Sequence, residues 1–303
     1  MKNIKIYIVT YRRPEVLNKT LETLFNKTDF NSVPETEVNI INNHSEFYLD
    51  ESFRGKVNVL HNTLRPDVDV GNLSRNWNQS LLNGFKDLNN PDSKIVVTMQ
   101  NDIVLHEKWC SNLLKMHQKY NFIVGRIGDN IISYTPGSVK RIGLWDERYC
   151  SICHKEADYF LRALILNREK SIINDVYHKR FLNETEYLPL EKMTYQGAES
   201  EWLKVKNRDS ANNATKHSSQ IFYYKWNNPL YPEPKYDGWL INWSKNFVTN
   251  PPPLPLVKNF ISYHYFEKDV ETLKLQNYVG FEKEDKWMRS TGNLYYEEVS
   301  RND

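Results

Sequence analysis

The amino-acid sequence predicts an α/β domain built on a mainly parallel β-sheet, and three observations favour this fold class. Strand-like and helix-like segments alternate from residue 4 to about residue 120. The strand-like segments are short and apolar, as the strands of a buried sheet are. Polar loops follow three of the strands, at residues 10–13, 42–45 and 100–102. Ligands bind beyond the carboxyl ends of the strands in such sheets, so these loops are where chemistry is expected.

Each element has its own local signal. Ile4, Ile6 and Ile8 alternate before the apolar run continues, which indicates a strand. Pro14 opens the first helix, because proline fits the first helical position. Apolar residues then recur at helical spacing over residues 16–25. The remaining elements are expected as strands at 38–41 and 57–60, a helix from Gly71, a strand at 95–99 and a helix at about 107–120.

Composition excludes several classes of function. The chain has 303 residues and a net charge of +2, with both signs interspersed, so nucleic acid is not expected as its main partner. No apolar run approaches the roughly 20 residues that a membrane helix requires. The start of the chain is too short and too interrupted by lysine for a signal peptide. We therefore expect a cytoplasmic protein without an integral membrane segment.

Two of the three cysteines form the local pattern Cys150-Ser151-Ile152-Cys153-His154, which matches a c-type haem attachment motif or half of a zinc site. Haem attachment needs export of the chain, and no export signal is visible. A zinc site needs further ligands, and the sequence contains no second cysteine pair of this spacing. We interpret these two residues as reduced thiols in a loop.

Two places in the chain carry carboxylates that could do chemistry. Asp102 follows the strand at 95–99, where it could bind Mg²⁺ or Mn²⁺, although an aspartate there is often a turn residue. Glu156 and Asp158 open an apolar helix. One of them could take a proton as a general base, although carboxylates in a first turn also stabilise a helix. His178 is a further candidate metal ligand, although a lone histidine is usually structural.

Several segments match the motifs of one enzyme family and occur in the same order. Thr10-Tyr11-Arg12-Arg13-Pro14 is similar to the donor loop T-Y-x-R-P, and residues 143–149 are similar to the acceptor motif G-G-F-D-E-R-F. The other matches are Asn42-Asn43-His44-Ser45 to D-N-G-S, residues 71–78 to G-x-x-x-A-x-N, Gln100-Asn101-Asp102 to D-x-D, residues 155–162 to the base motif E-D-x-D-L-x-x-R with Lys155-Glu156 in place of its E-D pair, and His178 to a late histidine. On these residues, roughly 4 to 180, the chain resembles the GT-A glycosyltransferases, particularly the family 2-like members.

The resemblance implies a Rossmann-like GT-A domain over residues 1–200. It leaves residues 201–303 as an aromatic-rich C-terminal extension, which we expect to pack on the acceptor side. The implied reaction moves a sugar from a nucleotide-sugar donor, with a UDP-sugar favoured, to a glycan or other hydroxyl acceptor, with inversion. The implied cofactor is Mn²⁺ or Mg²⁺.

The resemblance also implies a role for each matching residue. Glu156 or Asp158 is the catalytic base, with Glu156 at the position that the family uses. Asp102 and His178 are metal ligands. Trp145 and Asp146 lie on the acceptor side. The donor-binding residues are Thr10, Tyr11, Arg13, Asn42, Asn76, Gln100 and Asn101.

Two alternatives remain open at the level of the sequence. Asn42 and Gln100 replace aspartates of the family motifs, which keeps open a degenerate GT-A domain that binds glycans or partners without turnover. A sugar-phosphate nucleotidyltransferase also uses an α/β nucleotide fold. That enzyme needs a glycine-rich phosphate loop after the first strand, and residues 10–13 contain no glycine.

Overall fold

The computed structural model describes residues 2–62, 73–118, 120–124, 129–147, 149, 155–156, 158–159 and 190–192. The chain divides into two compact units. Unit 1 comprises Met1–Asp67, Gln79–Lys140 and Ser171–Leu203, and unit 2 comprises Val68–Asn78, Arg141–Lys170 and Lys204–Asp303. The predicted metal ligand His178, the cysteine pair at 150 and 153, and the expected extension 201–303 lie outside the described residues. Within the described ranges, no helix combines the length and apolar character needed to cross a membrane.

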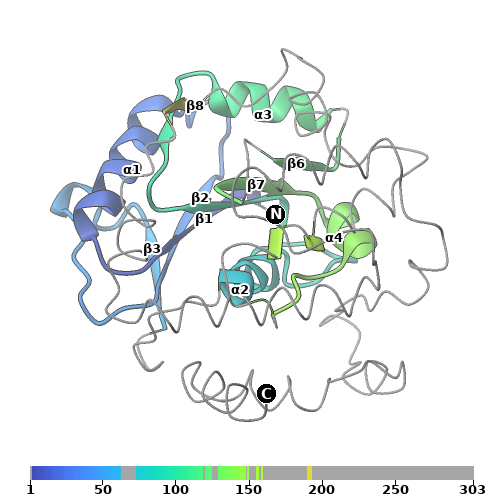
Figure 1. Cartoon of the computed structure of the whole chain (residues 1–303). Coiled ribbons are helices and arrows are strands. Elements are labelled where there is room, and N and C mark those ends of the chain that lie inside the picture. Colours follow the sequence, from blue (N-terminus) through green and yellow to red (C-terminus); the bar gives the residue numbers. More distant parts are fainter. Residues whose placement is uncertain are drawn as a thin grey trace, which may run out of the picture. The chain divides into compact units, whose positions relative to one another are not determined.

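The secondary structure follows the predicted alternation of strands and helices (Figure 1). The elements are β1 (Lys2–Thr10), α1 (Pro14–Lys27), β2 (Glu37–Asn42), a 3₁₀ helix η1 (Glu51–Phe53), β3 (Asn58–His61), α2 (Leu73–Phe85), β4 (Ser93–Gln100), β5 (Val104–Leu105), α3 (Trp109–His117), β6 (Phe122–Val124), β7 (Ile131–Tyr134), α4 (Pro136–Ile142) and β8 (Leu190–Lys192).

The main sheet has six strands in the order β3-β2-β1-β4-β7-β6. Neighbouring strands from β3 to β4 are parallel, whereas β7 is antiparallel to both β4 and β6. A separate antiparallel pair joins β5 and β8. This mixed, mainly parallel sheet flanked by helices confirms the predicted fold class, and it agrees with the GT-A fold that the motif resemblance implied.

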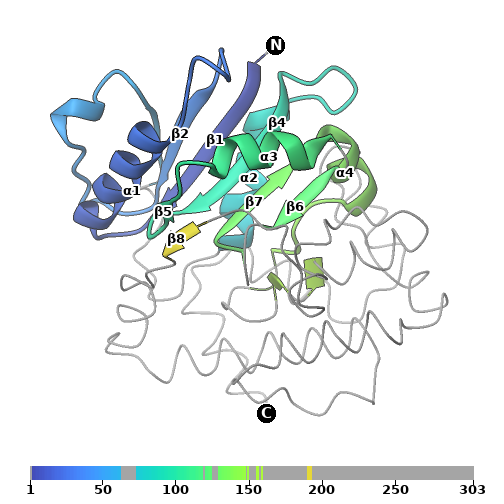
Figure 2. The same ribbon diagram turned by 90° about the horizontal axis from the view of Figure 1, so that it is seen from above.

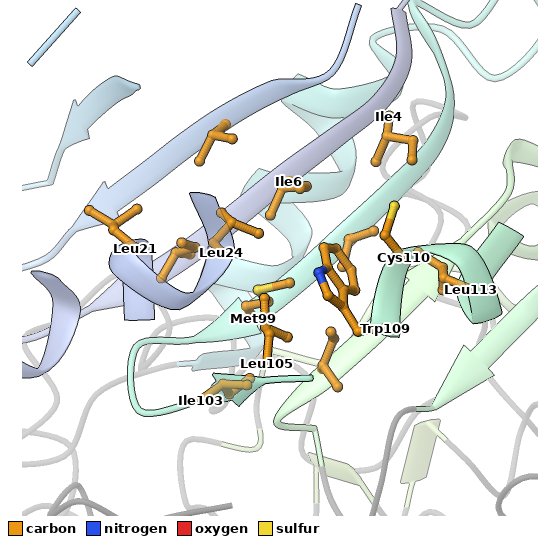
Figure 3. Packing of buried hydrophobic residues seen from close by; sticks show 14 of the residues in the cluster. Ile4, Ile6, Leu21, Leu24, Met99, Ile103, Leu105, Trp109, Cys110 and Leu113 are labelled. Atoms are coloured by element: carbon orange, nitrogen blue, oxygen red, sulfur yellow. The ribbon is translucent and has the colours of Figure 1, made fainter. Parts of the chain in front are cut away.

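One face of the sheet is covered by α1 and α3 and forms the core of unit 1 (Figures 2 and 3). Side chains alternate between the two faces of a strand, so the alternating isoleucines of β1 share one face. Ile4, Ile6 and Ile8 are at most 1% exposed and pack in one cluster with Leu21 and Trp109. Burial of this cluster is what the period-two pattern of the sequence predicted.

The opposite face of β1 and β4 contacts the C-terminal half of α2, and a glycine permits the close approach. A Cβ built on Gly84 would lie 2.4 Å from Cγ2 of Val96 and 3.3 Å from Cε2 of Tyr7. Leu81 and Phe85, which flank this position on α2, are fully buried. The backbone of α2 therefore rests directly on the sheet at Gly84.

Several short elements escaped the sequence-based prediction. These are η1, α4 and the strands β5 to β8, which have two to seven residues each. Segments this short do not contain enough residues to show a period. The predicted helix at 107–120 is observed as α3 over Trp109–His117, and the other predicted elements are observed within a few residues of their expected bounds.

Replacing Gly84 with alanine is expected to destabilise the protein by about 1–3 kcal/mol, because the added methyl group overlaps the side chain of Val96. The free energy of unfolding, measured with urea, checks this prediction. Gly137→Ala is the matched control, because a Cβ at Gly137 meets only the hydroxyl of Thr135 at 3.8 Å. Equal stability of the two variants would contradict the close packing of α2.

A half-buried histidine gives the fold a specific pH dependence. The ring of His117 lies 3.0 Å from the carbonyl oxygen of Tyr120 through Nδ1 and 2.6 Å from the hydroxyl of Ser133 through Nε2. A neutral ring satisfies both contacts if Nδ1 donates and Nε2 accepts. Burial lowers the pKa of His117 from 6.5 to about 4.

Because the folded pKa lies below the unfolded value, the unfolded chain binds the proton first as the pH falls. The neutral ring therefore contributes its full stabilisation above about pH 6.5. As the pH falls toward 4, the free energy of unfolding decreases progressively, by about 3 kcal/mol. Urea unfolding at pH 7 and pH 4.5 should show a smaller loss for His117→Gln than for the original chain. His106→Gln, at a partly exposed histidine on the same unit, should keep the full loss.

Candidate functional site

Polar side chains from three parallel strands meet at the carboxyl edge of the sheet in unit 1. Thr10 ends β1 and pairs in register with Asn42, which ends β2. Asn101 follows β4, and its Nδ2 donates a hydrogen bond to Oγ1 of Thr10 at 2.9 Å. Asn43 closes the group, because its backbone N–H donates to the carbonyl oxygen of Thr10 at 3.0 Å. We call Thr10, Asn42, Asn43, His44 and Asn101 the carboxyl-edge cluster.

The loop after β1 brings two arginines and a tyrosine to this edge in an unusual backbone conformation. Arg12 and Arg13 have φ values of 53° and 58°, the left-handed region that L-residues seldom adopt. The Nε of Arg12 lies 3.0 Å from Nε2 of His44, and the guanidinium lies over the ring of Tyr11, 5.6 Å from its centroid. Strained consecutive residues at a strand end are typical of functional loops. Arg13 forms an ion pair with Glu15 in the first turn of α1.

The side chain of Asn42 shapes the turn that follows β2. Its Nδ2 donates to the carbonyl oxygen of His44 at 2.7 Å, and its Oδ1 accepts from the backbone N–H of His44 at 3.2 Å. The same Nδ2 lies 3.1 Å from Nδ1 of His61 on β3. An aspartate at this position could not donate to that carbonyl, so the replacement of the family's aspartate fits the local hydrogen bonding.

Gln100 holds a carboxylate from elsewhere in the chain at the end of β4. Its Nε2 donates to Oδ1 of Asp129 at 2.8 Å, and its backbone N–H donates to the carbonyl oxygen of Asn130 at 2.9 Å. Asp129 is 2% exposed. The first aspartate of D-x-D is absent at position 100, yet an acidic side chain is held there by the glutamine. Asp102, the predicted metal ligand, is 8% exposed in the turn after the strand.

The described residues do not assemble a complete metal site. No group of three histidine, cysteine, aspartate or glutamate side chains suited to a metal ion occurs within those residues. Asp102 and Asp129 provide the hard oxygen atoms that Mg²⁺ and Mn²⁺ prefer. The predicted second ligand, His178, lies outside the described residues, so its role stays a prediction.

In unit 2, the first turns of α2 fix the segment that begins at Gly143. Asn78 pairs its side-chain amide with the backbone of Trp145. Its Nδ2 donates to the carbonyl oxygen of Trp145 at 2.9 Å, and its Oδ1 accepts the Trp145 N–H at 2.8 Å. This arrangement reproduces the hydrogen bonding between neighbouring strands. The segment is thereby held in one orientation by a helix residue 67 positions earlier.

A buried carboxylate strengthens the same junction. Oε1 of Glu147 accepts from Nδ2 of Asn78 at 2.9 Å, and Oε2 accepts from Nε of Arg75 at 3.0 Å. Charge-assisted hydrogen bonds of this kind are stronger than neutral ones. Trp145 stacks on Tyr159 with ring centroids 4.3 Å apart and is fully buried. Its expected place on the acceptor side, together with that of Asp146, stays a prediction.

The two candidate bases lie in a buried and charged environment. Oε1 of Glu156 accepts a hydrogen bond from Nζ of Lys155 at 2.6 Å, and both side chains are at most 7% exposed. An ammonium group at this distance favours the ionised carboxylate, which is the form that a general base needs. Asp158 is fully buried. Asn76, predicted to bind the donor, is 4% exposed on α2.

Three residues that form important contacts in these regions were not predicted from the sequence. Asn78 belongs to a motif that the sequence shows, but hydrophobic periodicity cannot show that its side chain binds the backbone of Trp145. Asp129 precedes a four-residue strand that was not predicted, so its proximity to Gln100 could not be inferred. His44 stands where the family motif has glycine, and that departure was a visible signal of a new side chain at the edge.

Comparison with known proteins identifies solved structures of nucleotide-sugar glycosyltransferases. No protein-family model and no curated protein sequence matches the chain. A mannosyltransferase from Pyrobaculum calidifontis, solved with GDP-Man and Mn²⁺, is 10% identical, with 98% of this chain and 86% of that chain covered and a TM-score of 0.40. TarS (residues 1–349) from S. aureus, solved with UDP-GlcNAc, is 11% identical, with 95% and 91% covered and a TM-score of 0.40.

Glucosyl-3-phosphoglycerate synthase from Mycobacterium tuberculosis, solved with Mn²⁺, UDP and glucosyl-3-phosphoglycerate, is 10% identical. The alignment covers 57% of this chain and 68% of that chain, with a TM-score of 0.37. These identities and TM-scores are too low for any residue or ligand to be carried over to this chain.

The Asn78→Ala variant is expected to lower the free energy of unfolding by about 3 kcal/mol, because it removes three buried hydrogen bonds of Asn78, two to the backbone of Trp145 and one to the carboxylate of Glu147. Hydrogen exchange at the Trp145 amide should accelerate at the same time. Asn78→Asp should be at least as harmful, since a carboxylate cannot donate and repels Glu147. Asn90→Ala, at an exposed asparagine, is the control and should change neither measurement.

Proposed function

We propose that this chain is a glycosyltransferase that moves a sugar from a nucleotide-sugar donor to an acceptor hydroxyl group. The observation that carries the proposal is the meeting of three motif segments at one edge of the sheet. Thr10, Asn42 and Asn101 lie far apart in sequence, and strand register and hydrogen bonds bring them together. Ligands of open α/β sheets bind at this edge.

The carboxyl-edge cluster and its neighbouring loop have the chemistry of a nucleotide site. Tyr11 offers an aromatic ring to a base, and its contact with His44 leaves the two rings edge to face, 5.1 Å apart. Arg12 and Arg13 bring two positive charges, which suit a diphosphate. Gln100 and the cluster's amides supply further hydrogen-bonding groups. A UDP-sugar is the favoured donor, on the strength of the motif resemblance.

The proposed transfer step needs one general base. Glu156, or else Asp158, accepts the proton of the acceptor hydroxyl, whose oxygen forms a bond to the anomeric carbon of the donor sugar. The bond between that carbon and the diphosphate oxygen breaks, and the nucleoside diphosphate leaves with the bonding electrons. Attack from the face opposite the leaving group inverts the configuration. The ion pair with Lys155 supports Glu156 in this role, because it favours the charged carboxylate.

A divalent cation is part of the proposal. Asp102 would hold Mn²⁺ or Mg²⁺ through a carboxylate oxygen, with His178 as the second proposed ligand and Asp129 close to Gln100 as a further oxygen donor. The bound ion would offset the negative charge of the leaving diphosphate. A readout independent of turnover is Mn²⁺ binding by calorimetry, which Asp102→Asn should weaken.

One observation favours a second candidate, a domain that binds nucleotide sugars or glycans without turnover. The amides of Asn42 and Gln100, which stand in place of two family aspartates, are engaged with His44 and Asp129. Two carboxylates are thus missing from their usual positions. Binding of a donor without hydrolysis or transfer would favour this candidate over the enzyme.

The test is a panel of UDP-, GDP- and dTDP-sugars assayed for hydrolysis and transfer with and without Mn²⁺. At least one donor should be consumed, and Glu156→Gln should lower kcat by roughly 10²- to 10⁴-fold while the donor Kd stays unchanged, because a base acts only in the chemical step. Glu51→Gln, at an exposed glutamate of η1, is the control and should keep full activity. Absence of both turnover and donor binding would sink the proposal. Full activity of Glu156→Gln would move the base to Asp158.

A further inference from the structure

A polar cavity of about 570 Å³ opens on the sheet in unit 1, on the face that carries Lys5 and Tyr7. It lies over β1, β2 and β3, which are neighbours in the sheet (Figure 1). Tyr7, Asn39 and Asn58 form one row across it, because they are successive partners in the strand register. Its lining contains no residue of the carboxyl-edge cluster. About 10 Å of strand separates Tyr7 from Thr10 at a rise of about 3.3 Å per residue. The cavity and the proposed donor site are therefore lined by different residues.

The hydroxyl group of Tyr7 is the first sign that this cavity holds a ligand. Tyr7 is 2% exposed and lines the cavity, and no hydrogen bond joins its hydroxyl to any described residue. The close approach of α2 at Gly84 restrains the ring, since a Cβ there would lie 3.3 Å from Cε2 of Tyr7. The ring is buried, but the hydroxyl is not fully enclosed, so it is accessible from the cavity that Tyr7 lines. A bound molecule in the cavity could therefore hydrogen-bond to it.

Both lysine ammonium groups that line the cavity form ion pairs with one carboxylate, that of Asp92. Nζ of Lys5 is 3.0 Å from Oδ2 of Asp92 and also donates to the carbonyl oxygen of Asn83 at 3.5 Å. Nζ of Lys86 is 2.6 Å from the same Oδ2. Hydrogen bonds from Lys86 and Lys5 lower the pKa of Asp92 to about 2. Asp92 is therefore ionised and balanced by both ammonium groups.

The two other carboxylates of the cavity are not hydrogen-bonded to its ammonium groups, although Glu37 attracts Lys86 from a greater distance than Asp92 does. Glu37 lies opposite Lys5 in the strand register, but Lys5 is bonded to Asp92 instead. Among the described residues, neither Glu35 nor Glu37 forms a hydrogen bond or an ion pair through its side chain. Burial raises the pKa of Tyr7, and the charges of Glu37 and Asp92 raise it further. The cavity is thus negative in potential and rich in hydrogen-bond acceptors.

We propose that this cavity binds a small organic cation through a primary ammonium group, which donates hydrogen bonds to the carboxylate of Glu37 and to the hydroxyl oxygen of Tyr7. An ammonium group supplies a positive charge for Glu37 and hydrogen-bond donors for both oxygen acceptors, whereas the ammonium groups of the lining are bonded to Asp92. A metal ion fits less well, because the described residues offer no group of three suitable ligands. An anion is disfavoured by Glu35 and Glu37. The proposal does not depend on sugar transfer.

The test uses putrescine as the probe, titrated into the full chain and followed by calorimetry. Its matched ligand is 1,4-butanediol, which has the same carbon chain but hydroxyl groups in place of the ammonium groups. Putrescine should bind saturably and more weakly as salt rises, whereas the diol should not bind. Glu37→Gln keeps the shape of the side chain and should weaken binding at least about tenfold, and Tyr7→Phe should weaken it several-fold.

Glu22→Gln is the control variant, because Glu22 is an exposed glutamate on α1, which covers the other face of the sheet. It should bind putrescine as the original chain does. Circular dichroism confirms that each variant is folded before titration. Absence of saturable putrescine binding, equal binding of the diol, or unchanged affinity in Glu37→Gln would each overturn the proposal. None of these outcomes bears on nucleotide-sugar turnover, so the two proposals fail separately.

Discussion

Burial of β1 on both faces is the constraint on which the structure of unit 1 depends. Ile4, Ile6 and Ile8 face the core beneath α1 and α3, so Lys5 and Tyr7 must face the side covered in part by α2. A lysine can be buried there because the end of α2 and Asp92 supply oxygen atoms to its ammonium group. One strand therefore carries two polar regions, the loop of residues 10–13 at its carboxyl end and the cavity lined by Lys5 and Tyr7.

Much of this architecture was predictable because it is encoded by local periodicity. The alternation of β1, proline at the start of α1 and the apolar run of β4 each depend on neighbouring residues, and the structure confirms all three. The order of strands in the sheet is a long-range property with no local signal. The antiparallel insertion of β7 beside β4 illustrates this, since a four-residue strand shows no period and its partner lies more than 30 residues earlier.

The candidate site also has features that the sequence predicts and others that only the structure shows. The alternation of strands and helices predicted that the loops with Thr10, Asn42 and Asn101 follow the carboxyl ends of strands in one parallel sheet, where ligands bind. The exchange of two family aspartates for amides suggested lost function. In the structure, both amides form hydrogen bonds that an aspartate could not form. Asn42 donates to the carbonyl oxygen of His44, and Gln100 donates to the carboxylate of Asp129. Position 100 thus lacks a carboxylate of its own but lies beside that of Asp129, 29 residues later in the chain. No local sequence pattern could reveal this proximity.

The pairing of Asn78 with the backbone of Trp145 limits how this protein can be altered. A loop anchored only at its own ends can be exchanged for another of similar length. The segment that begins at Gly143 is instead anchored by a side chain that belongs to α2. Residues 143–147 and the start of α2 therefore form one module, and a transplanted segment keeps its shape only if the asparagine is transplanted with it. Substitutions that keep Asn78 can change the side chains of this segment, while the path of its backbone at Trp145 is set by the helix.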